Sequence, residues 1–407
     1  MIVKYELRPI QSFGSVLGGG TPKAEAINWN GPIPFITPTE LAGLDGKLVG
    51  EAARSITEAG VRQSALILSG VLVSCRAPIG AIGTTISAVS FNQGCKGIPI
   101  ADERQARYLA YALVASRDKL EATGNGTTFS EISSTVLGQI RVPAPPLEIQ
   151  RAIADYLDRE TAEIDAMSAD LDEMEALLTE RRRSVVSNLT SNTSWEYVSL
   201  RSLASAPGGL FTDGDWVELK DQDPRGHIRL LQLADVGDGF FRDKTDKWVN
   251  DEKFDVLDCT SLCEGDILIA RMPDPIARAA IVPDLRYRAI TVVDVAILRA
   301  PPTEDPRYLM HAINSAEFRS CVESKVAGST RQRISRSALG REAIRRPELV
   351  TQRRIADEID RETAEIDAML ADIAELRDLL AERRAAVIAA AVTGQIDIPA
   401  AKETTHA

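Results

Sequence analysis

The chain of 407 residues lacks the features that mark several large protein classes. It contains no run of 18 or more apolar residues, which argues against a membrane-spanning helix, and its first residues lack the apolar core of a secretory signal. The five cysteines are odd in number and form no CxxC pair, so neither a disulfide framework nor a structural zinc site is expected. We expect a cytoplasmic protein with reduced thiols.

Sequence motifs for catalysis are also scarce. There is no GxxxxGK[ST] loop for nucleotide phosphates, and no Asn/Asp-Pro-Pro-aromatic tetrapeptide of the kind that amino-methyltransferases use. Only three histidines are present, and no acid-x-Lys follows Asp294 to complete a nuclease-like carboxylate set. These absences predict a recognition protein with no catalytic residues, no metal and no cofactor of its own.

The main positive feature is an internal repeat. Asp158-Arg-Glu-Thr-Ala-Glu-Ile-Asp-Ala-Met167 recurs unchanged as Asp360-Arg-Glu-Thr-Ala-Glu-Ile-Asp-Ala-Met369, and residues 147–190 match 349–392 at 25 of 44 positions. Weaker matches extend the repeat backwards, with 107–112 matching 307–312 and 70–76 matching 265–271 at offset 195. A repeat of this size indicates that the chain consists of two similar blocks, each followed by a similar helix.

The strongly repeated segments have the pattern of long coiled-coil helices. Apolar residues recur at alternating intervals of three and four for about five heptads, and prolines precede each segment, where a helix tolerates them. About 40 residues at 1.5 Å each predict rods of about 60 Å. The predicted seam comprises Ile153, Leu157, Ile164, Met167, Leu171 and Leu178 in the first helix, and Ile355, Ile359, Ile366, Met369, Ile373 and Leu380 in the second.

A narrow apolar stripe on so long a helix favours a second helix as its partner, and the chain supplies one. The alternative is that each helix lies on its own block. If the blocks are related by a pseudo-two-fold axis, the helices run antiparallel. The predicted organisation is block 1 at 1–144, first helix at 145–194, block 2 at 195–346, second helix at 347–398 and a tail at 399–407.

Within the blocks we expect mixed α/β structure, with strands at 66–69, 71–74, 84–89, 228–233, 266–270 and 290–298, and helices at 104–120 and 306–326. The fold class is therefore α+β, with two similar mixed domains separated by two long helices that form an antiparallel coiled coil.

The net charge of −12 does not exclude a nucleic acid as partner, because the excess acid lies in the helices. Residues 145–194 hold 5 basic and 11 acidic residues, and residues 347–407 hold 7 and 13. The blocks are close to neutral, and their loops place basic and amide side chains beside glycines, a composition suited to phosphates and base edges. The candidate DNA-binding residues are Lys23, Trp29, Asn30, Arg76, Asn92, Gln93, Lys96, Thr127, Thr128, Arg271, Arg278, Arg286, Arg288, Thr330, Arg331, Gln332, Arg333 and Arg336. The alternative for any one arginine is an ordinary solvated surface residue.

Several motifs resemble those of the specificity subunits of type I restriction–modification systems. They are Gly19-Gly-Thr-Pro22, Trp29-Asn-Gly-Pro-Ile-Pro-Phe-Ile36, Arg76-Ala-Pro-Ile-Gly80, Asn92-Gln-Gly94 and the junction Val142-Pro-Ala-Pro-Pro-Leu-Glu-Ile-Gln-Arg-Ala-Ile-Ala154. The resemblance extends over nearly the whole chain in the order of its blocks and helices. Block 2 departs from it at Arg346-Pro-Glu-Leu349, where the family usually has a Pro-Pro pair.

The resemblance implies two target recognition domains that read the halves of a split, asymmetric site on double-stranded DNA. It implies further that the helices set the spacing of the halves and dock two modification subunits, which bind S-adenosylmethionine and methylate adenine. Restriction subunits that use ATP and Mg²⁺ would complete the complex. A system for methylation only, a coiled-coil scaffold with two protein-binding modules, and an independent DNA enzyme are the alternatives.

Overall fold

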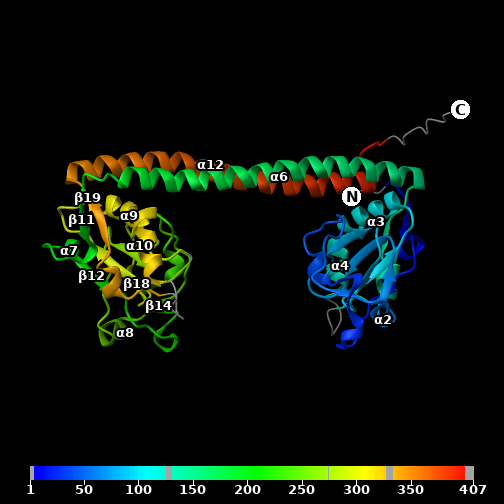
Figure 1. Ribbon diagram of the computed structural model, residues 1–407, viewed down its shortest axis with the longest axis horizontal. Helices are drawn as coiled ribbons and strands as arrows, with labels where there is room; N and C mark the ends of the chain where they lie inside the picture. Colours follow the sequence, from blue (N-terminus) through cyan, green and yellow to red (C-terminus); the bar gives the residue numbers. More distant parts are fainter. Residues whose placement is uncertain (1–3, 125–130, 274, 327–332, 399–407) are drawn as a thin grey trace. The chain divides into compact units, whose positions relative to one another are not determined.

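The computed structural model describes residues 4–124, 131–273, 275–326 and 333–398, and the chain forms two compact units. Unit 1 comprises Met1–Leu171 and Glu375–Ala407, and unit 2 comprises Asp172–Ala374. The two long helices, α6 at Leu147–Thr190 and α12 at Leu349–Thr393, each contribute one part to each unit (Figure 1). The prediction of two long helices is confirmed.

The globular part of unit 1 contains short strands in three sheets, ordered β1–β10, β2–β9–β6–β7 and β4–β3–β8–β5. Its strands are β1 (Leu7–Pro9), β2 (Leu17–Gly18), β3 (Trp29–Ile36), β4 (Ser55–Ile56), β5 (Ala65–Ile67), β6 (Gly70–Ser74), β7 (Ile82–Thr85), β8 (Val89–Phe91), β9 (Cys95–Pro99) and β10 (Arg141–Pro143). Its helices are α1 (Pro38–Leu41), α2 (Glu58–Val61), α3 (Glu103–Val114), α4 (Arg117–Gly124) and α5 (Ser134–Gln139).

Unit 2 repeats this plan with sheets ordered β11–β19, β12–β18–β15–β16 and β14–β13–β17. Its strands are β11 (Glu196–Ser199), β12 (Leu210–Asp213), β13 (Ile228–Leu231), β14 (Trp248–Val249), β15 (Ile267–Ala270), β16 (Ala279–Ile281), β17 (Arg288–Thr291), β18 (Val295–Arg299) and β19 (Ala343–Arg346). Its helices are α7 (Leu200–Ala204), α8 (Asp251–Val256), α9 (Pro306–Asn314), α10 (Ala316–Val326) and α11 (Arg336–Leu339). The two blocks have one fold, because β3 pairs with β8 and β13 with β17 in parallel, while the sheets β2–β9–β6–β7 and β12–β18–β15–β16 are antiparallel.

Some predicted elements are divided in the structure. The helix expected at 104–120 is α3 followed by α4, and the helix expected at 306–326 is α9 followed by α10. The strand expected at 290–298 was wrong as a single element, since residues 292–294 turn the chain from β17 into β18. The run Ile290-Thr-Val-Val293 is apolar and β-branched throughout, and such a run gives no signal of a turn within it.

The main core of each unit lies where its globular part meets both long helices. In unit 1, Ile153 and Leu157 of α6 share a buried cluster with Ala391 of α12 and with α3, while Asp165, further along α6, pairs with Arg384 at 2.7 Å. As the residue numbers increase along α6, the residue numbers of the contacting positions on α12 decrease. The two helices are therefore antiparallel in this unit. Full burial of such aliphatic side chains stabilises the fold by about 1.5–3 kcal/mol each.

The same arrangement occurs in unit 2. Ile355 and Ile359 of α12 share a cluster with Val186 of α6 and with α9, and Arg182 of α6 pairs with Asp367 of α12 at 2.9 Å. Since Ile355 and Ile359 correspond to Ile153 and Leu157 in the repeat, each helix contributes the same face to a different unit. Of the described helices, none is long and apolar enough to cross a membrane.

The seam between the helices differs from the prediction at two positions. Met167 and Met369 are 44% and 51% exposed, whereas Thr161 and Thr363 are buried. The other predicted seam residues, Ile153, Leu157, Ile164, Leu171, Leu178, Ile355, Ile359, Ile366, Ile373 and Leu380, are buried or half-buried. The correction has a simple cause: the hydroxyl of Thr363 donates to the carbonyl oxygen of Ile359 at 2.8 Å, so a threonine can occupy a seam position without an unsatisfied polar group.

Candidate nucleic-acid interface

In each unit the backbone of a glycine packs directly against the backbone of a turn between two strands. A Cβ on Gly19 would lie 1.9 Å from the carbonyl oxygen of Asn92, and a Cβ on Gly214 would lie 2.3 Å from that of Val292. Only glycine permits this approach of backbone to backbone. The turn at residues 92–94, between β8 and β9, and the turn at 292–294, between β17 and β18, are thus equivalent.

In unit 1 the predicted residues Arg76, Gln93 and Lys96 come together around Glu131. The Glu131 carboxylate accepts from Arg76 Nη2 at 2.7 Å and lies 3.4 Å from Lys96 Nζ, which also donates to the carbonyl oxygen of Gln93 at 3.3 Å. Partial burial alone would raise the pKa of Glu131, but these two cations hold it below its usual value. Arg76 remains 46% exposed and keeps its predicted place at the surface, whereas Lys96 is only 7% exposed, which corrects its assignment to the DNA-contacting surface.

A second group of predicted residues surrounds Trp29. Its indole N–H donates to the carbonyl oxygen of Lys23 at 2.9 Å, and the Arg54 guanidinium lies 3.6 Å from the ring centroid. Lys23, Asn30 and Arg54 are exposed, and Asn30 adopts a left-handed backbone with φ of 61°. Arg54 was not predicted, because its contact with Trp29 joins β3 to the segment before β4, and only the fold brings these together.

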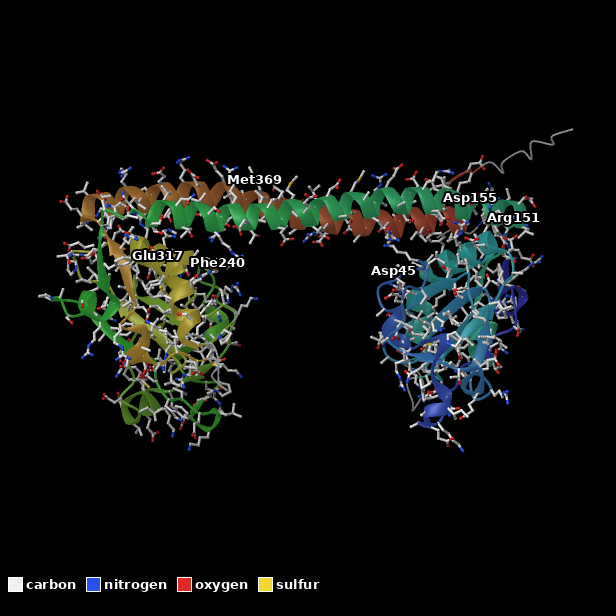
Figure 2. All side chains as sticks on the ribbon, viewed as in Figure 1. Asp45, Arg151, Asp155, Phe240, Glu317 and Met369 are labelled. Atoms are coloured by element: carbon white, nitrogen blue, oxygen red, sulfur yellow. The ribbon has the colours of Figure 1, made fainter. Side chains whose placement is uncertain are left out.

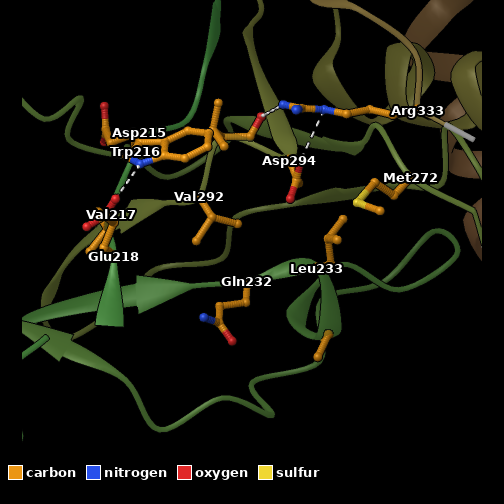
Figure 3. Close-up of a pocket in the computed structure, with 12 residues that line it drawn as sticks. Asp215, Trp216, Val217, Glu218, Gln232, Leu233, Met272, Val292, Asp294 and Arg333 are labelled. Carbon is orange, nitrogen blue, oxygen red and sulfur yellow. Dashed lines mark hydrogen bonds and ion pairs between the residues drawn. The ribbon is translucent and has the colours of Figure 1, made fainter. Parts of the chain in front are cut away.

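Unit 2 has a pocket where unit 1 has its basic cluster. The pocket has a volume of about 790 Å³ and is lined by Asp215, Trp216, Val217, Glu218, Gln232, Leu233, Ala234, Met272, Val292, Val293, Asp294 and Arg333 (Figure 3). Arg333 Nε lies 3.0 Å from Asp294 Oδ1, and its Nη2 donates to the carbonyl oxygen of Val293 at 3.1 Å. Of these residues only Arg333 was predicted.

The walls of the pocket combine acidic and apolar groups. The exposed Trp216 indole donates to Glu218 Oε1 at 3.3 Å, which fixes the ring at the rim. Burial raises the pKa of Asp215 to about 6, although this carboxylate accepts two hydrogen bonds from the backbone N–H of Thr260. Three carboxylates and one guanidinium make the pocket acidic overall.

Two predicted DNA-contacting arginines prove to be internal. Arg271 is 5% exposed, its guanidinium ion-pairs with Asp213, and its Nε donates to the carbonyl oxygen of Ile334 at 3.0 Å. Arg278 is 7% exposed and donates to the carbonyl oxygens of Val236 and Leu233, both at 2.8 Å. Their assignment to the surface is therefore corrected: buried backbone carbonyls need donors, and each guanidinium supplies several.

The structure also corrects the alignment of the two blocks near these arginines. The N–H of Cys75 donates to the carbonyl oxygen of Gly94 at 2.7 Å, and the N–H of Arg271 donates to that of Asp294 at 2.9 Å. Cys75 is therefore the equivalent of Arg271, and the offset is 196 rather than 195. Arg76 corresponds to Met272, which explains why Arg76 is exposed and Arg271 is buried.

The other predicted residues of unit 2 are dispersed. Arg288 ion-pairs with Asp251 at 2.9 Å, Arg286 is exposed, and Arg336 is exposed at 3.9 Å from Asp213. In unit 1, Asn92 is half-buried, and its side-chain oxygen accepts from the N–H of Gly94 at 2.9 Å. Thr127, Thr128, Thr330, Arg331 and Gln332 lie outside the described residues. Within the described ranges no group of His, Cys, Asp and Glu side chains could hold a metal ion.

The long helices carry exposed apolar side chains that the globular parts leave uncovered. In unit 1 these are Met167, Leu376 and Leu379, exposed by 44%, 47% and 52%. In unit 2 they are Met369, Met174 and Leu177, exposed by 51%, 51% and 64%. Figure 2 shows Met369 at the surface of the helix pair. The two sets are equivalent in the repeat at offset 202, so each unit presents the same apolar set.

Part of the chain is similar in sequence to a known family and to two known proteins. Residues 2–176 match the family described as "Type I restriction modification DNA specificity domain". The "Type I restriction enzyme MjaIX specificity subunit" of Methanocaldococcus jannaschii is 31% identical over 159 residues, 38% of this chain and 37% of that protein. A putative MjaX specificity subunit of the same organism is 34% identical over 88 residues, 21% of each chain. The present chain thus aligns with 37% of the length of the first relative and with 21% of the length of the second.

Solved structures resemble the whole chain in fold. A chain from a study titled "Structural basis underlying complex assembly and conformational transition of the type I R-M system" has a TM-score of 0.75 at 15% identity, and the match covers 97% of this chain and 100% of that one. The HsdS subunit from Thermoanaerobacter tengcongensis has a TM-score of 0.50 at 15% identity, with 97% and 95% covered. Both likenesses extend through the two blocks and the two helices.

Proposed function

We propose that the chain is a specificity subunit of a type I restriction–modification system and that it recognises a split, asymmetric DNA site, one half with each unit. The proposal rests chiefly on one observation. Apart from an additional strand, β5, in unit 1, the two units have the same strand order, yet the turns and loops at their equivalent positions carry different side chains. One fold positions both surfaces in the same way, and the loop residues give each surface its own preference.

The contacts to DNA would be of two kinds. Lys23 and Arg54 of unit 1 are exposed cations on loops, suited to phosphate oxygens. Arg76 and Gln93 lie beside the β8–β9 turn and can donate to base edges, since arginine pairs with guanine and glutamine with adenine. Phosphate contacts orient the protein on the duplex, and base contacts supply the sequence preference.

The partners would dock on the helices. Met167, Leu376 and Leu379 in unit 1, and their equivalents in unit 2, are six exposed apolar side chains on otherwise acidic helices. Exposed apolar groups that recur in equivalent places favour a protein partner present in two copies. We propose that these partners are two modification subunits.

The chemistry of the system would belong to those partners. The modification subunits would bind S-adenosylmethionine and methylate an adenine flipped out of the duplex. Restriction subunits, where the system has them, would use ATP and Mg²⁺ for translocation and cleavage. The role of this chain is to place those subunits at one sequence.

The test is single-molecule methylation sequencing of DNA from cells that express the modification subunit with or without this chain. The expected result is adenine methylation at a bipartite motif with a fixed gap, present only with the chain. If the modification subunit is active and no methylation depends on the chain, the proposal is wrong and the scaffold alternative takes its place.

A further inference from the structure

The two units carry opposite charges at one equivalent position. The N–H of Ile132 donates to the carbonyl oxygen of Cys75 at 3.1 Å, and the N–H of Ile334 donates to that of Arg271 at 3.0 Å. The preceding residues, Glu131 and Arg333, are therefore equivalent. In unit 1 the position is acidic and its partners are basic, whereas in unit 2 the position is basic and its partner is acidic.

In unit 2 the acidic partner lies on the turn that Gly214 holds in place, whereas in unit 1 the basic partners lie outside the equivalent turn at 92–94. Unit 1 has Gly94 at the third residue of the turn. The cations that pair with Glu131 are Arg76 and Lys96. Unit 2 has Asp294 at the same place, paired with Arg333 at 3.0 Å. The turn in unit 2 thus offers a carboxylate where the turn in unit 1 offers none.

The pocket in unit 2 contains further acidic side chains beside Asp294. Asp294 carries its carboxylate between Arg333 and the centre of the pocket, with Glu218 and Trp216 on the opposite wall (Figure 3). The apolar side chains of Leu233, Met272 and Val292 form part of the lining. A site of this kind would repel a phosphate, because its carboxylates outnumber its one guanidinium. It favours a ligand with an amino donor on a flat, partly apolar frame.

We propose that this pocket is a base-reading site in which Asp294 accepts a hydrogen bond from an exocyclic amino group, either N4 of cytosine or N6 of adenine. The base lies at one position of the half-site that unit 2 reads, called here the second half-site. The inference rests on the proposed DNA-recognition function and adds the chemical class of its ligand. Carboxylates are the acceptors suited to cytosine N4, and each well-placed contact of this kind discriminates by about 1–3 kcal/mol against a wrong base.

Arg333 has a positioning role in this site. Its guanidinium is anchored by the hydrogen bond from Nη2 to the carbonyl oxygen of Val293 and ion-pairs with Asp294, so the carboxylate has a positioned charged neighbour before a base arrives. Trp216 is 67% exposed, and its hydrogen bond to Glu218 presents the indole face at the rim, where it can contact the apolar part of a base. Fixing the acceptor beforehand lowers the entropic cost of binding.

The experiment uses the chain assembled with its modification subunits and a fluorescent duplex that carries the methylated motif. Each adenine of the second half-site is replaced in turn by 2′-deoxynebularine, and each cytosine by a 2-pyrimidinone nucleoside, which removes only the amino group. One replacement should weaken binding about 10-fold in the wild-type complex. The identity of the base at that position shows whether the amino group that Asp294 contacts belongs to cytosine or to adenine.

Two substitutions connect this loss to the pocket. With Asp294→Ala, or with Asp294→Leu should the alanine variant fail to fold, the side chain offers no acceptor, and the complex should bind the normal and the amino-free duplex with nearly equal affinity at that one position. The matched control, Glu131→Gln in unit 1, should leave the 10-fold loss in the second half-site unchanged.

If the wild-type complex binds the motif specifically but no amino group of the second half-site depends on Asp294, the pocket has another role and only this inference fails. Dependence in the first half-site would also overturn it. If the complex shows no sequence-specific binding at all, the failure is that of the proposed function.

Discussion

Replacing Asp360 by asparagine should loosen the attachment of the unit 2 globular part to helix α12. The Asp360 carboxylate meets His311 Nε2 at 2.7 Å and Arg307 Nη1 at 2.9 Å, and both partners come from α9. His311 is 4% exposed, so a lost partner cannot be replaced by bulk water. Asparagine keeps the shape of the side chain but loses the charge that both contacts use.

The size of the effect follows from these contacts. A hydrogen bond to a charged group contributes about 1.5–3 kcal/mol. The Asp360 side chain is 41% exposed, so solvent screening reduces its share, and we expect a loss of about 1–2 kcal/mol in the free energy of unfolding. Three of the four tryptophans, Trp195, Trp216 and Trp248, lie in unit 2, so urea unfolding followed by tryptophan fluorescence reports mainly on that unit.

The pH dependence has a definite sign. Partial burial would raise the pKa of Asp360, but His311 and Arg307 outweigh it and hold the pKa below its usual value. The stabilisation is therefore present above the unfolded pKa of about 3.9 and is lost as the pH falls through the lower folded pKa. The difference between wild type and Asp360→Asn should be full at pH 7 and should shrink below pH 4.

Unit 1 supplies the matched control. Asp158 occupies the equivalent position, bonded to Tyr111 at 2.9 Å and to Arg107, but burial raises its pKa overall. Because a raised pKa means that ionisation of Asp158 costs stability as the pH rises, Asp158→Asn should destabilise less than Asp360→Asn at pH 7. An Asp360→Asn protein as stable as wild type at pH 7, or a loss that grows below pH 4, would refute the reasoning.

Three further predictions concern other parts of the chain. Arg278→Ala should lower the free energy of unfolding of unit 2 by about 2–4 kcal/mol, measured by urea titration, because it leaves buried carbonyl oxygens without donors; a loss under 0.5 kcal/mol would return Arg278 to the list of surface contacts. Met369→Glu should weaken modification-subunit binding at one of two sites, so that native mass spectrometry shows one bound copy instead of two, while Met167→Glu affects the other; unchanged stoichiometry would exclude these side chains from docking. One heptad added to both helices should lengthen the gap in the methylated motif by roughly three base pairs, since seven residues span about 10 Å; an unchanged gap would show that the helices do not set the spacing.

The duplicated architecture was predictable from the sequence because it rests on periodicity. Two identical ten-residue segments and a sustained heptad pattern predict two long helices, whatever the loops do. The exposure of Met167 and Met369 was not predictable, because apolar spacing alone does not show that threonines can occupy the seam. Thr363 does so by bonding to its own helix, and Thr161 by bonding to the Tyr111 hydroxyl of α3.

The candidate site was less predictable, for reasons that the arginines illustrate. Arg271 and Arg278 look like surface cations in the sequence, and only the fold shows the carbonyl groups that their guanidinium groups satisfy. Arg54 gains its role from a contact with Trp29 of β3, which is distant in the sequence. The charge exchange between Glu131 and Arg333 became visible only when backbone hydrogen bonds corrected the alignment by one residue.

The central claim is that each unit reads its own half-site, and a chain with one unit in both places tests it most directly. Residues 195–346 would be replaced by a second copy of residues 1–144, with both helices kept. Methylation sequencing with the modification subunit should then yield an inverted repeat of the first half-site with a comparable gap. A folded, partner-bound hybrid that still methylates the original asymmetric motif would contradict the account.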